Sequence, residues 1–406
     1  SFYAGVFGAR WLAPGVTRMP SADYTMMNTE LRTDTCFAFR EAGVFGQWHG
    51  ANAEEFRRGS HLPAAFTPPP PGMEMFGAPL QPAAAEAPDI AAYGSERGAA
   101  RIAETIATLI NAGANADAET RARRERAAWP PGTNTWSLNA LDWLTPAAAA
   151  ECAARDEKEG SPAASLLFTA NCAADQLAKL FPDAPPRIHL LLSPALRRPP
   201  RTLRPADNVI VQLSAADLDF SRPMGDPANA AFAADLRGWA KLGGKLWVLD
   251  QAANRRDPRL PFPNLHTIPD NLLFCAQNGV SGVYALGGGT GKDNAADLAE
   301  MRACLWAQLL WNPDIACDET LREFCALYYG PAGNAVLECV GLQENAVKAA
   351  GRPLRGDDDC GWLDAATAKR IEDTVAAALA LPSLPKEMKP RVEAVQASIR
   401  SAGEKR

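Results

Sequence analysis

The chain has 406 residues and a formal net charge of -6, with 47% hydrophobic and 22% charged residues. This average globular composition excludes a fibrous repeat and a wholly disordered chain, and the acidic balance argues against a nucleic-acid partner, because binding phosphates needs a concentrated basic face. No apolar run approaches the roughly 20 residues of a transmembrane helix, so we expect no membrane partner, and the oligomeric state stays open.

Proline and glycine punctuate the first third of the sequence, so its periodic segments are short. The runs 67–72 and 78–88 are typical of loops. Apolar residues at helical spacing predict a helix over 98–113 that ends at a glycine. The remaining patterns predict strands over 35–40, 61–66, 73–77 and 133–142.

From residue 161 onward, runs of valine, isoleucine and leucine alternate with helical patterns, which is typical of a buried parallel sheet. The predicted strands are 188–192, 209–213, 246–250 and 280–286. The predicted helices are 161–180, 228–242 and 295–311. We therefore predict an α/β fold, a (β/α)8 TIM-like barrel over 31–330. A helical C-terminal region is expected over 331–406, with helices at 332–350, 364–381 and 386–401.

Two carboxylates close predicted strands, at the ends where a parallel barrel carries its active site. Asp142 ends the segment WSLNALD and Asp250 ends the segment KLWVLD. Glycoside hydrolysis needs two carboxyl groups, because one protonates the leaving oxygen while the other stabilises or activates the opposite face of the sugar. The structural alternative is that each aspartate caps the turn that follows it.

Aromatic and hydrogen-bonding side chains near the strand ends are candidates for substrate binding. Aromatic rings offer an apolar floor for sugar rings, and Arg40 suits a substrate carboxylate. Core packing and ordinary surface polarity explain the same residues. The candidates are Arg40, Trp48, His49, Asn52, His61, Trp136, Asn139, Trp247 and Tyr284.

Other patterns complete no known motif. The glycine-rich run 286–292 lacks residues that a phosphate-binding loop or a dinucleotide fingerprint needs. The four histidines show no metal spacing and no G-x-S-x-G elbow is present, so we expect neither a metal nor a cofactor. The nine cysteines are expected to be small buried hydrophobes. A solvated loop is expected to hold Arg197, Arg198, Arg201 and Arg204.

Several segments together resemble a bacterial family of unknown-function domains related to the α-glucuronidases and the β-hexosaminidase-like glycoside hydrolases. They are FGARWLAPG (7–15), FAFRE (37–41), GSHLPAAFTPP (59–69), SLNALDW (137–143), DNVIVQL (207–213), WVLDQAANRRDPRLPFPNLHTIPDNLLF (247–274), NGVSGVYALG (278–287), LLWNPD (309–314) and EFCALYYGPA (323–332). The resemblance implies a TIM-like barrel acting on glycans, usually in an exported, periplasmic or extracellular protein. It also implies a small α/β domain before the barrel, so residues 1–30 are expected to be the end of a truncated domain and its linker.

The sequence departs from the family's pattern at the expected site. Residues 147–150 are alanines where many relatives carry cysteines, the acidic pair of the hexosaminidases is not reproduced at Asp142 and Trp143, and residues 284–286 contain no acid. We predict a glycoside hydrolase-like protein acting on an oligo- or polysaccharide, with Asp142 as the general acid and Asp250 as the second carboxylate. The alternatives are a catalytically inactive carbohydrate-binding barrel and an intracellular scaffold that assembles through its helical region.

Overall fold

The computed structural model describes residues 150–286, 296–311 and 314–404, apart from a few side chains within them. It also describes the backbone of four short strands before residue 140 and parts of a helix within 96–107.

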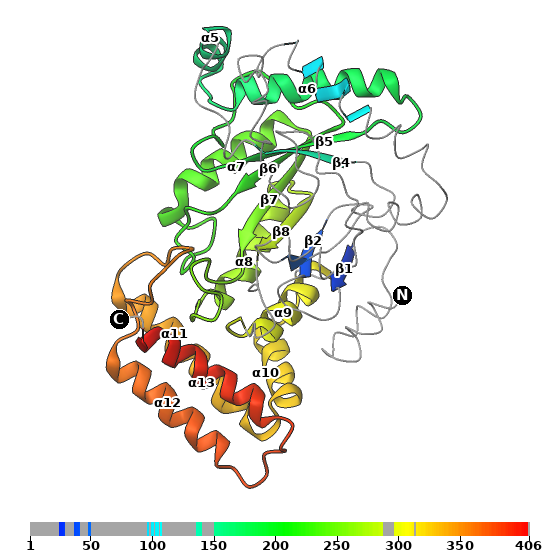
Figure 1. The fold of residues 1–406 in the computed structure, drawn as a ribbon. Helices are drawn as coiled ribbons and strands as arrows, with labels where there is room; N and C mark the ends of the chain where they lie inside the picture. Colours follow the sequence, from blue (N-terminus) through cyan, green and yellow to red (C-terminus); the bar gives the residue numbers. More distant parts are fainter. Residues whose placement is uncertain are drawn as a thin grey trace, which may run out of the picture.

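A parallel sheet forms the centre of the described structure (Figure 1). Its core is four neighbouring strands: β5 (Arg187–Leu192), β6 (Val209–Ser214), β7 (Lys245–Gln251) and β8 (Gly282–Leu286). At its two ends the sheet is extended by β4 (Thr135–Asn139) beside β5 and by β3 (Trp48–His49) beside β8. The order is β3-β8-β7-β6-β5-β4, and every neighbouring pair is parallel.

The α/β class and the strands predicted after residue 130 are confirmed, whereas closure into a (β/α)8 barrel stays a prediction. Expected strands at 61–66 and 73–77 lie outside the described residues. The strand expected at 35–40 is β2 (Cys36–Arg40), which pairs antiparallel with β1 (Tyr24–Asn28) instead of joining the parallel sheet. A short connection favours this pairing, because a parallel pair needs a long crossover.

Helices follow the strands of the sheet, as the alternating pattern predicted. The predicted ones are α6 (Ala164–Leu180), α7 (Ala230–Leu242) and α9 (Ala299–Trp311). Three helices were not predicted: α5 (Ala150–Glu159), α8 (Ile268–Gln277) and α10 (Cys317–Tyr328). The sequence IPDN resembles a loop, but a proline in the first turn of a helix lacks only an N–H that has no helical partner anyway.

Short 3-10 turns directly precede α7, α8 and the helix that begins at residue 333. They are η4 (Pro227–Asn229), η5 (Leu265–Thr267) and η6 (Gly330–Ala332).

The two faces of the sheet differ in chemistry. Asp250 in β7 hydrogen-bonds the side chain of Asn271 in α8, so the face of β7 that carries Asp250 is turned toward that helix. Register places a buried aliphatic set on the same face: Ile188, Leu190, Leu192, Val209, Val211, Leu213, Leu246 and Val248. The opposite face carries buried polar and aromatic side chains: His189, Gln212, Ser214, Trp247 and Gln251.

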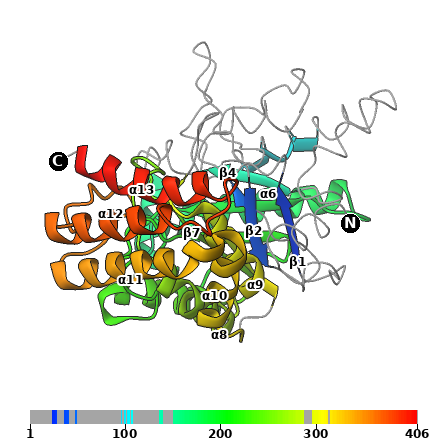
Figure 2. The same cartoon turned by 90° about the horizontal axis from the view of Figure 1, so that it is seen from below.

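A helical region follows the sheet, as predicted, and Figure 2 shows its long helices lying side by side. After α10 it consists of α11 (Gly333–Ala350), α12 (Ala365–Leu379) and α13 (Lys389–Glu404). Each packs against the next along the chain. Among the described helices, none combines the length and the apolar character needed to cross a bilayer.

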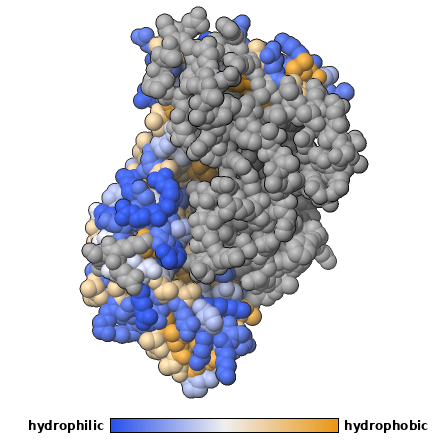
Figure 3. All heavy atoms as spheres, in the orientation of Figure 1, coloured by the Kyte–Doolittle hydropathy of each residue, from blue (hydrophilic) through white to orange (hydrophobic). Residues whose placement is uncertain are grey.

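On the surface shown in Figure 3, hydrophilic and apolar residues are mixed over the C-terminal helices. The large exposed apolar side chains of the described residues come from separate segments, so they do not mark one element as a docking face. They are Leu180, Leu273, Leu327 and Leu381.

Candidate functional site

The carboxyl ends of β3, β8 and β7 lie side by side in the sheet. Trp48 and Asp250 both pair in register with Ala285, and His49 lies one residue further along β3. Tyr284 directly precedes Ala285 in β8. The structure therefore brings the backbones of four predicted site residues to one part of the sheet edge.

The other predicted site residues are placed elsewhere. Trp136 and Asn139 lie in β4, at the opposite end of the strand order from β3. Arg40 ends β2, which lies beside β8. Three predicted residues fall outside the described residues, and their roles stay predictions: Asn52, His61 and Asp142.

Asp250 is a buried carboxyl group in the layer between the sheet and α8. Its side chain is 2% exposed, and its Oδ1 accepts a hydrogen bond of 2.7 Å from the backbone N–H of Gln251. Burial raises its pKa to about 7, against the opposing effects of the hydrogen bonds from Gln251 and from the Asn271 side chain. Asn271 in turn accepts a 2.7 Å hydrogen bond from the backbone N–H of Met224. Asp250 thus joins the end of β7 to α8 and, through Asn271, to the loop after β6.

Trp247 lies on the opposite face of β7 from Asp250, because side chains alternate along a strand. Its indole lies over Gly282 of β8, where an added Cβ would be 2.7 Å from both Cδ1 and Nε1 of the ring. Trp247 and Asp250, both predicted as site residues, therefore lie on opposite faces of the sheet. Their separation by three residues already indicates this, because side chains alternate between the faces of a strand.

Two buried polar residues beside Trp247 were not among the predicted site residues. His189 in β5 and Gln212 in β6 form a 3.0 Å hydrogen bond between Nε2 and Oε1, and the rings of His189 and Trp247 lie 5.6 Å apart. Burial lowers the pKa of His189 to about 4, although the hydrogen bond to Gln212 opposes this shift, so the imidazole is neutral at pH 7. The sequence does mark these two residues, because each is the polar residue inside an otherwise aliphatic strand segment, RIHLLL or VIVQLS.

The loop after β7 is held by side-chain amides. Gln251 Nε2 donates to the carbonyl oxygens of Ala253 and Gly356, at 2.8 and 2.7 Å. Asn254 Nδ2 donates to the carbonyl oxygen of Asp358 at 2.8 Å. The segment between α11 and α12 is thereby fixed against the carboxyl end of the sheet.

A buried ion pair fixes the last helix to the same loop. Arg302 in α9 contacts Asp297 at 3.5 Å and also hydrogen-bonds the side chain of Asn264 and the carbonyl oxygen of Phe262. Ser398 in α13 donates a 2.8 Å hydrogen bond to Asp297. The side chains of Arg302 and Asp297 are nearly inaccessible to water, so hydrogen bonds from the protein replace their hydration.

The expectation of a solvated arginine loop after β5 is wrong for Arg197. Its side chain is 3% exposed and forms ion pairs with Asp217 and with Asp235, the latter at 3.0 Å. It also donates to the carbonyl oxygen of Ser214 at 3.2 Å. Arginine is tolerated at this buried place because carboxylates and a carbonyl oxygen satisfy its guanidinium.

The prediction that the cysteines are small buried side chains is confirmed for most of the described cysteines. Eight cysteines are free thiols and six of them are buried. Burial raises the pKa of the thiols of Cys304, Cys325 and Cys339 to about 12, so these side chains act as small apolar groups and not as nucleophiles at neutral pH. Within the described ranges, no group of three or more histidine, cysteine and acidic side chains is placed to hold a metal ion.

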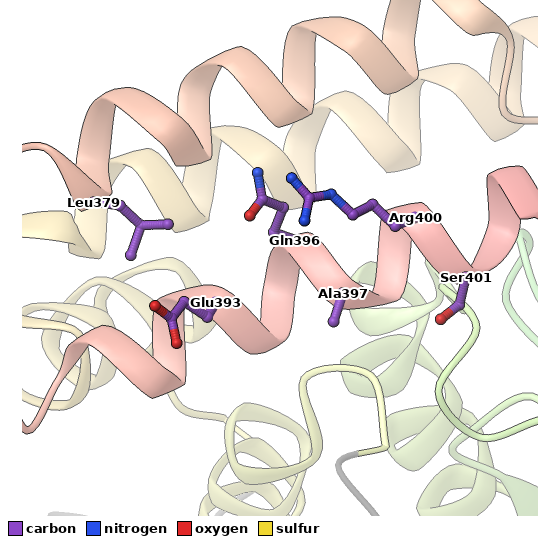
Figure 4. A pocket seen from close by; sticks show the side chains of 6 residues that line it. All are labelled: Leu379, Glu393, Gln396, Ala397, Arg400 and Ser401. Atoms are coloured by element: carbon purple, nitrogen blue, oxygen red, sulfur yellow. The ribbon is translucent and has the colours of Figure 1, made fainter.

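A shallow groove of about 500 Å³ runs between the C-terminal helices α12 and α13 (Figure 4). It contains none of the predicted site residues, and its charged residues are one acid and one base. Its lining is Leu379, Glu393, Gln396, Ala397, Arg400 and Ser401.

One comparison with known proteins gives a match. The family model described as domain of unknown function (DUF4838) matches residues 124–340. No curated protein and no solved structure matches the chain. The matched range includes β4 to β8 and the helices between them.

Proposed function

The chain belongs to the DUF4838 family of domains of unknown function, and from this premise we propose that it is a glycoside hydrolase-like protein acting on an oligo- or polysaccharide. The observation that carries the proposal is the parallel register at the carboxyl edge, which groups Trp48, His49 and Asp250. This edge is where parallel α/β folds place their ligands.

The strand order also favours closure of the sheet into the predicted barrel. The strands β4 to β8 neighbour one another in chain order, and the early strand β3 lies beside β8. In a (β/α)8 barrel the first strand likewise lies beside the last. Closure would bring the ends of β4 and β3 around one opening, with the end of β4 at Asn139 on one side and the end of β3 at His49 on the other.

In this proposal Asp142 is the general acid and Asp250 is the second carboxylate, while Arg40, His49 and His61 position the sugar. The pKa of Asp250 near 7 means that this carboxyl takes up and releases a proton close to neutral pH, as acid–base catalysis requires.

A second candidate function is a carbohydrate-binding barrel without hydrolysis. The placement of Asp250 favours it, because this carboxyl is 2% exposed and lies on the face turned toward α8, away from Trp247. A carboxylate that catalyses hydrolysis must reach the glycosidic bond, whereas one that ties β7 to α8 need not.

The two functions are separated by measuring reducing-end release and binding on a panel of polysaccharides. For a hydrolase, Asp142→Asn is expected to lower turnover about 100-fold or more while binding persists, because general acid catalysis contributes at least that much. Asp364→Asn, at the exposed N-cap of α12, is the matched control and is expected to keep native turnover.

Full turnover by Asp142→Asn would overturn the assignment of the acid. Binding of a glycan by the native protein with no release of reducing ends would select the second candidate.

A further inference from the structure

We propose that the face of the sheet turned away from α8 carries a hydrogen-bonding subsite for an uncharged hydroxyl group of a sugar, formed by Gln212, His189 and Trp247. The proposal deepens the proposed function, since it rests on a carbohydrate ligand and names the side chains that would contact it.

The geometry places the three side chains on neighbouring strands. Register sets Gln212 of β6 level with Trp247 of β7, and His189 of β5 contacts both of them, by the 3.0 Å hydrogen bond and the 5.6 Å ring contact. Because Trp247 and Asp250 are on opposite faces of β7, this cluster is separated from the carboxyl by the sheet itself.

Gln212 supplies the observation that points to a ligand. Among the described residues its side-chain oxygen accepts a hydrogen bond from His189 Nε2 alone, and its buried side-chain nitrogen, Nε2, has no hydrogen-bond partner there. The residue is 5% exposed, so bulk water does not replace the missing partner. A buried donor without an acceptor destabilises a fold, and a ligand atom that accepts from this nitrogen would remove that cost.

The chemistry of the cluster selects an uncharged acceptor. Gln212 carries no charge, and the lowered pKa of His189 keeps the imidazole neutral at pH 7. A carboxylate or phosphate buried here would find no charged partner among the three side chains of the cluster, whereas a hydroxyl oxygen accepts from Nε2 without that penalty. The indole of Trp247, which is 4% exposed and held in place over Gly282, is the aromatic member of the cluster and the side chain that the C–H groups of a bound sugar would contact.

Two cations on the same strands favour the competing hypothesis, in which the ligand is an anionic sugar. Arg187 and Lys245 each precede a member of the cluster by two residues, which is about 7 Å along a strand. An anionic sugar would be drawn to these cations, whereas the proposed subsite prefers the neutral sugar.

The test is calorimetric binding of glucose, N-acetylglucosamine and glucuronate at about 10 mM, a concentration that detects a millimolar Kd. The double variant His189→Leu/Gln212→Met removes both hydrogen-bonding partners, so neither is left unsatisfied in the core. Its matched control is Gln343→Met in α11, outside the sheet, which removes another buried amide whose Nε2 has no hydrogen-bond partner in the described part of the chain.

We expect the native protein and Gln343→Met to bind a neutral sugar equally, and the double variant to bind it at least about tenfold more weakly, with a native thermal melt confirming its fold. Unchanged binding by the double variant, a preference for glucuronate over both neutral sugars, or no neutral sugar bound by the native protein would each overturn the subsite. The native protein could cleave no glycan and still lose neutral-sugar binding in the double variant. That result would support the subsite and contradict the proposed hydrolase activity. Cleavage with an unchanged KM in the double variant would support hydrolysis while the subsite fails.

Discussion

The two faces of the parallel sheet each bury one ionisable side chain, and these side chains respond to pH in opposite directions. On the face turned toward α8, burial raises the pKa of Asp250 to about 7. On the other face, burial lowers the pKa of His189 to about 4. Both shifts favour the uncharged form, so both faces are electrically neutral at these positions between about pH 4 and 7.

The two groups have opposite effects on stability within that window. Above its ordinary pKa of 3.8, the Asp250 carboxyl stays protonated only in the folded state, so its contribution to stability is lost as the pH rises toward 7. Below its ordinary pKa of 6.5, His189 is protonated only in the unfolded state, so its contribution is lost as the pH falls toward 4. In the native protein these two pH dependences of the unfolding free energy largely cancel. A variant that removes one of the two groups is expected to reveal the pH dependence that the other contributes.

The largest effect is expected for Asp250→Asn, which keeps the shape of the side chain but cannot ionise. The difference in unfolding free energy between variant and native protein should shift in favour of the variant by up to about 4 kcal/mol as the pH rises from 4 to 8, at about 1.4 kcal/mol per pH unit. Urea unfolding across this pH range measures the difference.

Asp364→Asn is the control for that series, because the pKa of this exposed aspartate lies below 3.8 and its charge is constant above about pH 5. A native-minus-variant difference for Asp250→Asn that is equally flat would show that Asp250 is ionised in the folded protein throughout the range.

The next largest effect is expected for His189→Leu/Gln212→Met, which tests the opposite face. Relative to the native protein, this variant should gain up to about 3 kcal/mol as the pH falls from 7 to 4, because it lacks the histidine that only the unfolded chain protonates. The same urea series measures it. A relative loss toward acid would mean that His189 is protonated in the folded state, and the contrast between the two faces would disappear.

The smallest effect is expected for Gly282→Ala, which probes the packing of Trp247. The new Cβ would lie 2.7 Å from the indole, so the ring must move, at a free-energy cost of about 1–3 kcal/mol. Gly341→Ala in α11 is the control, because a Cβ there meets no atom of the described residues within 4 Å and a small stabilisation is expected from helix propensity. Chemical unfolding and near-ultraviolet circular dichroism report the two changes, and equal stability of both variants would contradict the contact.

The sequence predicted the elements whose patterns are strong. The aliphatic runs predicted β5 to β8, and apolar residues at helical spacing predicted α6, α7 and α9. Such patterns are readable because an element that buries one face repeats its apolar residues at a regular interval. α8 was missed because proline, aspartate and asparagine at residues 269–271 also suit a loop, and only packing on the sheet decides between the two.

The site was less predictable, because contact between distant segments decides it. Asp250 was identified from its position at a strand end, but the partner that determines its environment, Asn271, is in a helix that the pattern did not indicate. Gln212 and His189 become a pair only through the register of β5 and β6, which single-strand periodicity does not contain. Arg197 likewise looked solvated until its carboxylate partners were in place.

The hydrogen bond from Ser398 to Asp297 has a consequence for the order of synthesis. The two residues are separated by 101 positions, and Ser398 belongs to α13, so the buried carboxylate lacks this donor until residue 398 has left the ribosome. The sheet can pair earlier, but the junction between its carboxyl-end loop and the helical region is completed only after translation of α13. A chain that ends before this helix lacks the Ser398 donor to Asp297.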